Sequence, residues 1–474
     1  MKKKISIQQV MRQEIEDKKV FDLAQKYAYQ YMDGLFEWNV FPTQSALDQL
    51  REFEENLPEQ TTTATDVITM LNEIGSAATV AHLGGRYFGF VTGSSIPVAL
   101  AAKNLGTYWD QNTPLNVLSP LASKLESVCE RWLREIFHLP EHTVAGFVSG
   151  TSAANFCGLA AARFRLLKNQ GWDVGLKGIF GAPPLRVVIG KDAHSTVVKA
   201  LGLLGFGTDN MEWIEVDDQG RIRADLVPAL DDRTLLVLQA GNVNSGSFDD
   251  FRSLGERARN AKAWVHIDGA FGLWAAATNS LRHLTDGIEL ANSWAVDGHK
   301  TLNTPYDSGI ALCDDPEAMV SALHMSGSYI VLSKERDGMF YTPEMSRRAR
   351  VIELWAAMKY LGKNGINELV EGLHSRALQF ADELADMEGF NVVNEVVFNQ
   401  VLVQCPSDEL TSSVISRIQE LRECWVGGSV WKGKKVIRIS VCSWATTDED
   451  IKRSARSFAK AYKECTMAKE VGFS

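Results

Sequence analysis

The sequence predicts an α/β fold: a large domain with a mostly parallel sheet flanked by helices, followed by a smaller α+β domain. Short apolar runs rich in Val, Ile and Leu alternate with segments of helical periodicity through the middle of the chain, which is typical of parallel strands. The chain has 474 residues, enough for two or three domains. The predicted strands of the large domain are residues 144–148, 186–189, 235–238, 264–267, 294–296 and 310–313.

Three segments follow from this pattern. Residues 1–110 are predicted to be a helical segment, with apolar residues from Phe21 to Leu35 at helical spacing. Such a segment cannot bury its apolar face alone, so we expect it to pack on the main domain or at a dimer interface. Residues 111–350 form the predicted large domain and residues 351–474 the small one. The small domain begins with a helix from Val351 and has a helix over 367–388 and strands at 392–393, 401–403 and 436–440.

Composition narrows the class of protein. The net charge of −10 argues against nucleic acid or an anionic membrane surface as a partner. No run of about 18 apolar residues is present that could span a bilayer, and the basic start lacks the apolar core of a signal peptide. Seven scattered cysteines without a CxxC pair indicate reduced thiols. We therefore expect a cytoplasmic protein, and no motif predicts a metal site.

A carboxylate and an amine follow two of the predicted strands. Asp268 ends the strand 264–267, and Lys300 comes shortly after the strand 294–296. Because the carboxyl ends of parallel strands meet at one edge of a sheet, both side chains are expected there. This pair suits pyridoxal phosphate: the lysine forms a Schiff base, and the aspartate keeps the pyridine nitrogen protonated so that the ring accepts electrons.

Other motifs fall at the same edge. The turn 149–155 lies between a strand and a helix, where backbone N–H groups and the Thr151 and Ser152 hydroxyls suit a phosphate, although the same letters make an ordinary N-cap. His194 follows another strand and either stacks on the ring or caps the next helix. Asn242 is positioned to bond the cofactor's phenolic oxygen. The glycine-rich stretch 84–93 is either a loop that approaches a ligand or a strand between turns. The segment 324–345, with Tyr329, has no clear period and is predicted to be a long loop that is either functional or disordered.

Together these motifs resemble the group II pyridoxal-phosphate-dependent amino acid decarboxylases, which include the aromatic amino acid and glutamate decarboxylases. The resemblance rests on the order and spacing of four motifs over about residues 80 to 450, and on an arginine-rich helix start. The motifs are Ser-Gly-Thr-Ser-Ala-Ala-Asn (149–155), Asp-Ala-His-Ser (192–195), His-Ile-Asp-Gly-Ala (266–270), Asp-Gly-His-Lys (297–300) and Ser-Arg-Arg-Ala-Arg (346–350).

The resemblance implies a type I (aspartate aminotransferase-like) fold and a homodimer. It implies that Lys300 carries the cofactor, Asp268 faces the pyridine nitrogen, and Ala270 lies beneath the ring. It also implies that His194 stacks on the ring and that the loop residue Tyr329 protonates the α-carbon. The remaining implied cofactor ligands are Thr151, Ser152, Asn242, Asp297 and His299, and Arg438 is an implied substrate contact.

The expected activity is therefore decarboxylation of an L-amino acid to an amine and carbon dioxide. Phe88, Phe90 and Trp109 favour an aromatic side chain, whereas Arg86 would suit an acidic one. Departures from the aromatic decarboxylases at Gly241–Val243, Gly269 and Thr301 concern the substrate, not the cofactor. The alternatives are an aminotransferase, a carbon–carbon lyase acting on a phosphorylated amino alcohol, an aldehyde-forming oxidative decarboxylase and a catalytically silent cofactor-binding protein.

Overall fold

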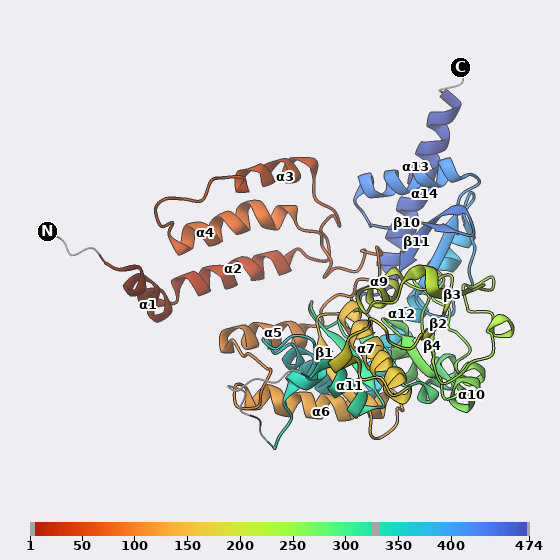
Figure 1. Ribbon diagram of the computed structural model, residues 1–474. Coiled ribbons are helices and arrows are strands. Elements are labelled where there is room, and N and C mark those ends of the chain that lie inside the picture. Colours follow the sequence, from red (N-terminus) through yellow and green to blue (C-terminus); the bar gives the residue numbers. More distant parts are fainter. Residues whose placement is uncertain (1–4, 325–331, 333, 472–474) are drawn as a thin grey trace.

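Two β-sheets organise residues 5–324, 332 and 334–471, which are the residues that the computed structural model describes (Figure 1). The larger sheet has the strand order β1-β7-β6-β5-β4-β2-β3. Strand β7 runs antiparallel to both of its neighbours, β1 and β6, and the other pairs are parallel. The strands are β1 (Val144–Val148), β2 (Arg186–Gly190), β3 (Met211–Ile214), β4 (Thr234–Gln239), β5 (Trp264–Asp268), β6 (Ser293–Asp297) and β7 (Gly309–Cys313).

The six predicted strands are confirmed. They could be predicted because each is an apolar run that the sheet buries on both faces. Strand β3 was not predicted. It lies at the sheet's edge, and Glu212 and Trp213 interrupt its apolar pattern. Between β5 and β6 the chain makes 3-10 turns instead of an α-helix (Gly272–Ala277, Arg282–Thr285 and Ile288–Leu290). The two strands are nevertheless parallel neighbours, as expected.

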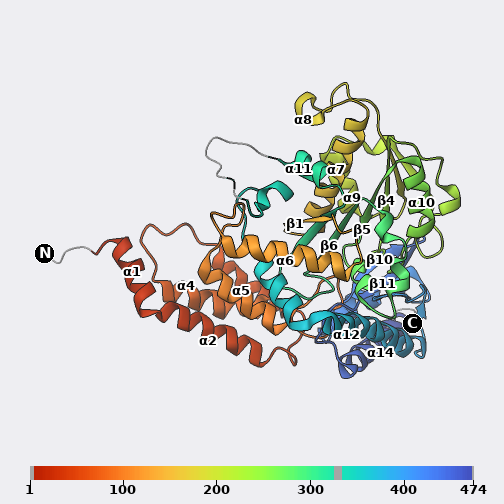
Figure 2. The same cartoon turned by 90° about the horizontal axis from the view of Figure 1, so that it is seen from below.

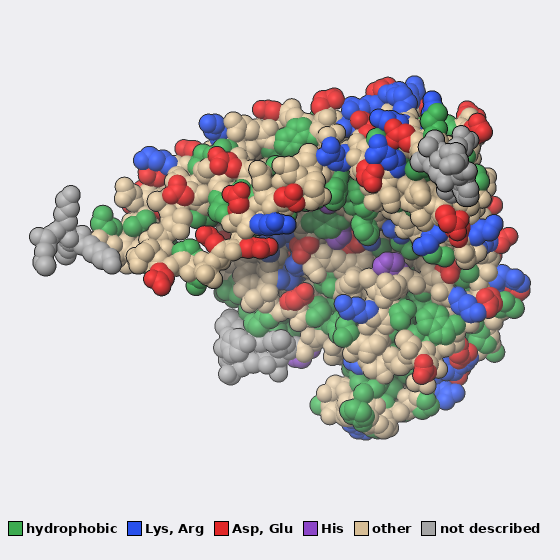
Figure 3. Space-filling view, turned by 90° about the horizontal axis from the view of Figure 1, so that it is seen from above, with side chains coloured by type: hydrophobic (Ala, Val, Ile, Leu, Met, Phe, Trp, Pro, Cys, Tyr) green, Lys and Arg blue, Asp and Glu red, His purple; other side chains and the backbone are tan. Residues whose placement is uncertain are grey.

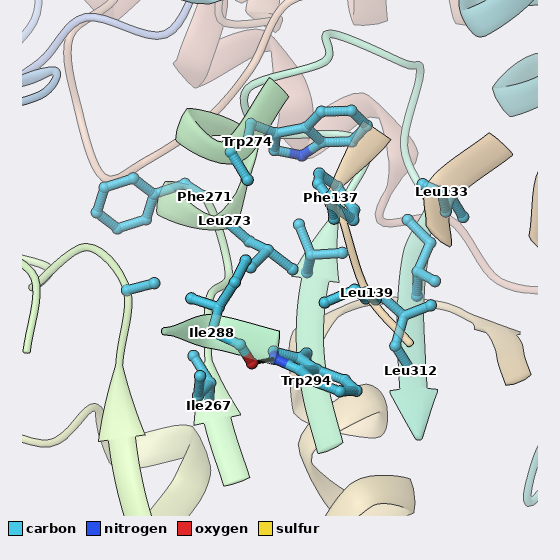
Figure 4. Close-up of a cluster of buried hydrophobic side chains, with 14 of the residues drawn as sticks. Leu133, Phe137, Leu139, Ile267, Phe271, Leu273, Trp274, Ile288, Trp294 and Leu312 are labelled. Carbon is cyan, nitrogen blue, oxygen red and sulfur yellow. Dashed lines mark hydrogen bonds between the residues drawn. The ribbon is translucent and has the colours of Figure 1, made fainter. Parts of the chain in front are cut away.

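Helices enclose this sheet. They are α5 (Pro97–Trp109), α6 (Pro120–Ile136), α7 (Thr151–Asn169), α8 (Val174–Lys177), α9 (Ser195–Leu203), α10 (Phe251–Ala261) and α11 (Pro316–Leu323). Helix α7 packs on β5, β6 and β7, and α10 packs on β5. On the side of α6 the core is aromatic: Phe137 meets Trp274 edge-to-face at 4.9 Å, and the Trp294 indole donates to the Ile288 carbonyl at 3.0 Å (Figure 4). The sheet is therefore a rigid platform for residues at its edges.

A four-stranded antiparallel sheet, ordered β10-β11-β9-β8, builds the C-terminal part. It comprises β8 (Asn391–Val392), β9 (Gln400–Gln404), β10 (Gly427–Trp431) and β11 (Lys434–Ser440), with α13 (Asp408–Leu421) and α14 (Asp448–Val471). Strand β10 was not predicted, because Gly427, Gly428 and Ser429 carry no strand signal. The two helices expected after residue 350 form one element, α12 (Val351–Ala385), which is kinked at Gly362 with φ +57°.

The N-terminal part of the chain contains the helices α1 (Ile7–Asp17), α2 (Lys19–Asp33), α3 (Gln44–Gln49) and α4 (Ala64–Met70). They extend away from the two sheets (Figures 1 and 2). Neither α1 nor α2 contains a buried residue. In the described part of the chain, no helix is both long enough and apolar enough to cross a membrane.

Candidate active site

A cavity of about 210 Å³ opens at the carboxyl ends of β4, β5 and β6. Its lining comes from both the large sheet and the segment before α5. A larger hollow of about 400 Å³ lies at the opposite end of β5, near Trp264, and contains none of the predicted site residues. The cavity is lined by Val91, Gly150, Thr151, Ser152, His194, Thr196, Gln239, Gly241, Val243, Asp268, Ala270, Phe271, Asp297, His299 and Lys300.

Lys300 enters this cavity from the loop after β6. Its Nζ lies 3.2 Å from Oδ2 of Asp297, and Nε2 of His299 lies 3.5 Å from the same oxygen. The other Asp297 oxygen, Oδ1, is buried without a hydrogen-bond partner among the described residues. Asp297 therefore holds the lysine amine at one oxygen and keeps a second oxygen available for a donor.

Asp268, the last residue of β5, lies on the cavity wall and is only 6% exposed. Its Oδ1 accepts a hydrogen bond from the Ala270 N–H at 3.2 Å. Burial raises the pKa of Asp268, and the nearby His194 and Lys300 oppose that rise. A buried carboxyl of this kind is stabilised as an anion only by a cationic partner, such as a protonated ring nitrogen.

His194 caps α9, as one of the two sequence interpretations expected, and it also lines the cavity. Its stacking on the cofactor ring stays a prediction. Its Nδ1 accepts from the Thr196 N–H at 3.3 Å and lies 2.7 Å from the Thr196 hydroxyl. Burial lowers the pKa of His194, so the ring is neutral. With Nδ1 acting as an acceptor, the ring proton is on Nε2, which leaves one N–H donor for a ligand.

The N-terminus of α7 lines one part of the cavity. Gly150 precedes the helix in an extended conformation and makes no side-chain cap. The Thr151 hydroxyl is buried without a hydrogen-bond partner among the described residues. A Cβ on Gly309 would lie 2.4 Å from Gly150 Cα, so the neighbouring strand packs directly against this turn. The N-terminus of a 19-residue helix and the unpaired Thr151 hydroxyl together are a donor set that suits a phosphate.

An amine, a buried carboxyl, a neutral imidazole and a phosphate-type site thus share one cavity, and this set fits pyridoxal phosphate. Asn242 is fully buried and lies outside the cavity lining, and its Nδ2 has no hydrogen-bond partner among the described residues, so its contact with the cofactor stays a prediction. Its Oδ1 turns back to accept from the Asn244 and Ser245 N–H groups, at 2.9 and 3.2 Å. Its neighbours Gly241 and Val243 line the cavity instead.

The expected substrate contacts lie elsewhere. Phe88 is fully buried against Phe380 in the small domain, so the prediction that it contacts substrate is wrong. Phe90 stacks on Trp425 at 5.7 Å and is 60% exposed, outside the cavity lining. The neighbours of both residues come from the distant C-terminal part of the chain, which the local sequence does not show. The contact of Phe90 with substrate stays a prediction.

The other three predicted substrate residues, two arginines and a tryptophan, lie in different places. Arg86 cannot bind an acidic substrate, because its buried guanidinium donates to the carbonyls of Phe36, Trp38 and Glu423. Trp109 is not part of the cavity lining. Arg438 lies beside the cavity, where Nη1 meets the Val243 carbonyl at 3.4 Å and Nε is buried without a hydrogen-bond partner among the described residues.

Tyr329 lies outside the described residues. Sequence reasoning missed three cavity residues: Gln239, Thr196 and Phe271. Gln239 ends β4, so the strand-end argument that identified Asp268 would also have found it. Nothing in the local sequence marks the other two residues as ligand contacts.

The chain matches the pyridoxal-dependent decarboxylase conserved domain over residues 48–405. It is 30% identical to an aspartate 1-decarboxylase from Aliivibrio fischeri, over 57% of this chain and 51% of that relative. It is 24% identical to an aromatic-L-amino-acid decarboxylase from Bacillus atrophaeus, over 84% of this chain and 85% of the relative.

Solved structures share the fold. The crystal structure of Oryza sativa TDC with PLP and tryptamine has a TM-score of 0.85 at 20% identity and covers 95% of this chain and 98% of that one. Mouse CSAD has a TM-score of 0.85 at 17% identity, with 94% and 98% coverage. The fold is thus the type I fold expected from the motifs, and its site carries the donor set of pyridoxal phosphate. The chain belongs to the family of pyridoxal-dependent decarboxylases.

Proposed function

We propose that this protein removes the α-carboxylate of an L-amino acid as carbon dioxide and releases the amine. The observation that carries the proposal is the shared cavity of Lys300, Asp268, His194 and the α7 N-terminus. Lys300 would hold the cofactor's aldehyde carbon. Asp268 would pair with its ring nitrogen, and the α7 N–H groups with Thr151 and Ser152 would bind its phosphate. When bound, pyridoxal phosphate supplies a protonated ring that accepts the electron pair left by the departing carboxylate.

The protein's own groups prepare that step. Asp297, with Oδ2 at 3.2 Å from the Lys300 Nζ, orients the amine and can take up or return its proton during exchange with a substrate amine. His194 presents its Nε2–H to an acceptor oxygen, and Ala270 and His299 complete the wall. Arg438 provides a cation beside Val243 for the substrate carboxylate, and its unpaired Nε supports this role.

The side-chain class of the substrate is the open part of the proposal. The relatives include decarboxylases named for aspartate, aromatic amino acids and cysteine sulfinic acid. Phe88 and Phe90 are not part of the cavity lining, so they no longer support an aromatic substrate. Arg86 is buried, so it no longer supports an acidic one. We therefore propose an L-amino acid of either class.

The first experiment identifies the lysine. Purified protein loaded with pyridoxal phosphate is reduced with borohydride, digested and mapped by mass spectrometry. We expect the cofactor mass on the peptide containing Lys300 and none in Lys300→Ala, which should fold normally but be inactive. A cofactor adduct on another lysine, or full turnover by Lys300→Ala, would refute the assigned role.

The second experiment identifies the reaction. The holoenzyme is incubated with the twenty common amino acids and cysteine sulfinic acid, and the products are identified by mass spectrometry. An amine and carbon dioxide in equal amounts are expected. A relative from Rhodiola rosea is a 4-hydroxyphenylacetaldehyde synthase, so an aldehyde is the product that would replace our proposal with oxidative decarboxylation. A keto acid without an amine would indicate transamination.

We propose further that residues 1–110 pack at the interface of a homodimer. On α1, Ile7, Met11 and Ile15 form an i, i+4, i+8 stripe and are each more than half exposed. Beside it, α2 and α4 border an apolar groove of about 380 Å³, and Figure 3 shows hydrophobic side chains along the projecting segment. Exposed apolar surface of this kind marks an interaction site.

Sedimentation tests the dimer. The protein is expected to sediment as a dimer, and Met11→Glu with Ile15→Glu to shift it toward the monomer. Phe180→Glu, at an exposed residue that follows α8 in the sequence, is the control that should not shift it. A monomeric parent protein would refute the proposal. The domain limits at residues 110 and 350 and the cytoplasmic location stay predictions, which limited proteolysis and cell fractionation can test.

A further inference from the structure

Asn303 lies three residues after Lys300, in the loop between β6 and β7, and is fully buried. Its backbone has φ +56°, a left-handed conformation that asparagine tolerates better than most residues. It does not line the cavity, and no sequence motif marks it.

Three hydrogen bonds from Asn303 hold the main chain of the loop that contains Lys300. The backbone N–H donates to the Lys300 carbonyl at 3.1 Å. The side-chain Nδ2 donates to the same carbonyl at 3.0 Å and to the Thr301 carbonyl at 2.9 Å. The main chain of the cofactor-binding lysine is therefore fixed from two directions by one residue.

The other hydrogen bonds of Asn303 reach two distant parts of the chain. Nδ2 also donates to the Cys442 carbonyl at 2.9 Å, and Oδ1 accepts from the Trp444 N–H at 2.9 Å, both just after β11 of the small domain. Oδ1 accepts from the Ser94 N–H at 3.2 Å as well. The Asn303 carbonyl accepts from the Ile96 N–H at 2.9 Å, at the start of α5.

We propose that Asn303 is a positioning residue that sets the main chain of Lys300 relative to the small domain and the segment before α5. Only a primary amide matches this site, because three carbonyl oxygens face its nitrogen and two N–H groups face its oxygen. An aspartate would place a carboxylate oxygen against those carbonyls. An apolar residue would remove the side-chain partner of four buried groups, the Thr301 and Cys442 carbonyls and the Ser94 and Trp444 N–H groups. The proposal rests on the role of Lys300 proposed above.

The test compares three variants as holoenzymes. Asn303→Gly allows the same backbone conformation and removes the amide. Asn303→Asp keeps the shape and removes the donors. Asn399→Asp is the matched control: Asn399 is equally buried and donates to the Val441 carbonyl at 3.1 Å and to the Cys442 Sγ at 3.2 Å, and no hydrogen bond among the described residues joins its side chain to residues 300–303. The readouts are kcat, KM and the pH midpoint of the visible absorption of the cofactor bound to Lys300.

Both Asn303 variants are expected to lower kcat by roughly tenfold to a hundredfold, with little change in KM, and to displace the pH midpoint. Asn399→Asp should lower the melting temperature and leave the midpoint unchanged. A wild-type midpoint and kcat in Asn303→Gly would overturn the proposal, as would an equal midpoint shift in Asn399→Asp. Borohydride mapping of the parent protein separates the two failures: no adduct on Lys300 would refute the proposed function and with it the basis of this inference, whereas an adduct on Lys300 with unchanged Asn303→Gly would refute the role of Asn303 alone.

Discussion

Replacing Gly93 with alanine is expected to slow turnover about a hundredfold. Gly93 belongs to the segment that passes directly over the lysine loop. A Cβ built there would lie 2.2 Å from the Lys300 carbonyl oxygen and 2.4 Å from that of His299, whereas ordinary contacts begin at 3.4 Å. The two segments must therefore separate by about 1.2 Å. A displacement of about 1 Å at a reacting group costs on the order of 10² in rate, and overpacking costs about 1–3 kcal/mol of stability.

The assay measures kcat and KM on the substrate found in the panel, together with the absorption of the bound cofactor and urea unfolding. The matched control is Gly84→Ala in the same segment, whose Cβ would meet the Ala81 and Leu35 carbonyls at 3.3 and 3.4 Å, close to ordinary contact. Gly84→Ala should retain nearly full activity. If Gly93→Ala retains the kcat and cofactor absorption of the parent, the close packing of this segment on Lys300 does not govern catalysis and our reasoning is wrong.

Glu126→Gln removes the buried carboxylate that pairs with Arg336 and Arg347 at 3.1 and 2.7 Å, and it should lower the free energy of unfolding measured in urea by about 3–5 kcal/mol. Glu215→Gln, at the exposed ion pair with Lys191, is the control and should change that free energy little. Equal effects of the two substitutions would contradict the argument. Burial lowers the pKa of His266 from 6.5 to about 3. Below pH 6.5 the unfolded chain therefore takes up a proton at this residue and the folded chain does not. The contribution of His266 to stability is complete above pH 6.5 and is reduced by about 3 kcal/mol at about pH 4.5. His266→Gln should flatten this slope by that amount, and an unchanged slope would show that another group causes it. Asp268→Asn should lower kcat by about a hundredfold or more, because a neutral amide does not stabilise a protonated ring nitrogen, and an unaltered kcat would exclude that pairing.

The sequence by itself predicted the site residues that lie at or just after the carboxyl ends of strands. Asp268 and Lys300 follow two buried apolar runs, and parallel strands bring their carboxyl ends to one edge, so period and order along the chain were enough. The same logic placed His194 after β2 and Thr151 after β1. The type I fold and the family followed from the order of these motifs.

Only the tertiary structure decided the positions of residues whose partners are far away in the sequence. Phe88 packs against Phe380, Arg86 bonds to Glu423, and Asn303 joins Ser94 to Trp444. An aromatic or arginine in a glycine-rich stretch looks the same whether it faces a ligand or a distant helix. Hydrogen bonds across hundreds of residues leave no local periodicity, because they are fixed by how the small domain packs on the large one and not by the conformation of either segment alone.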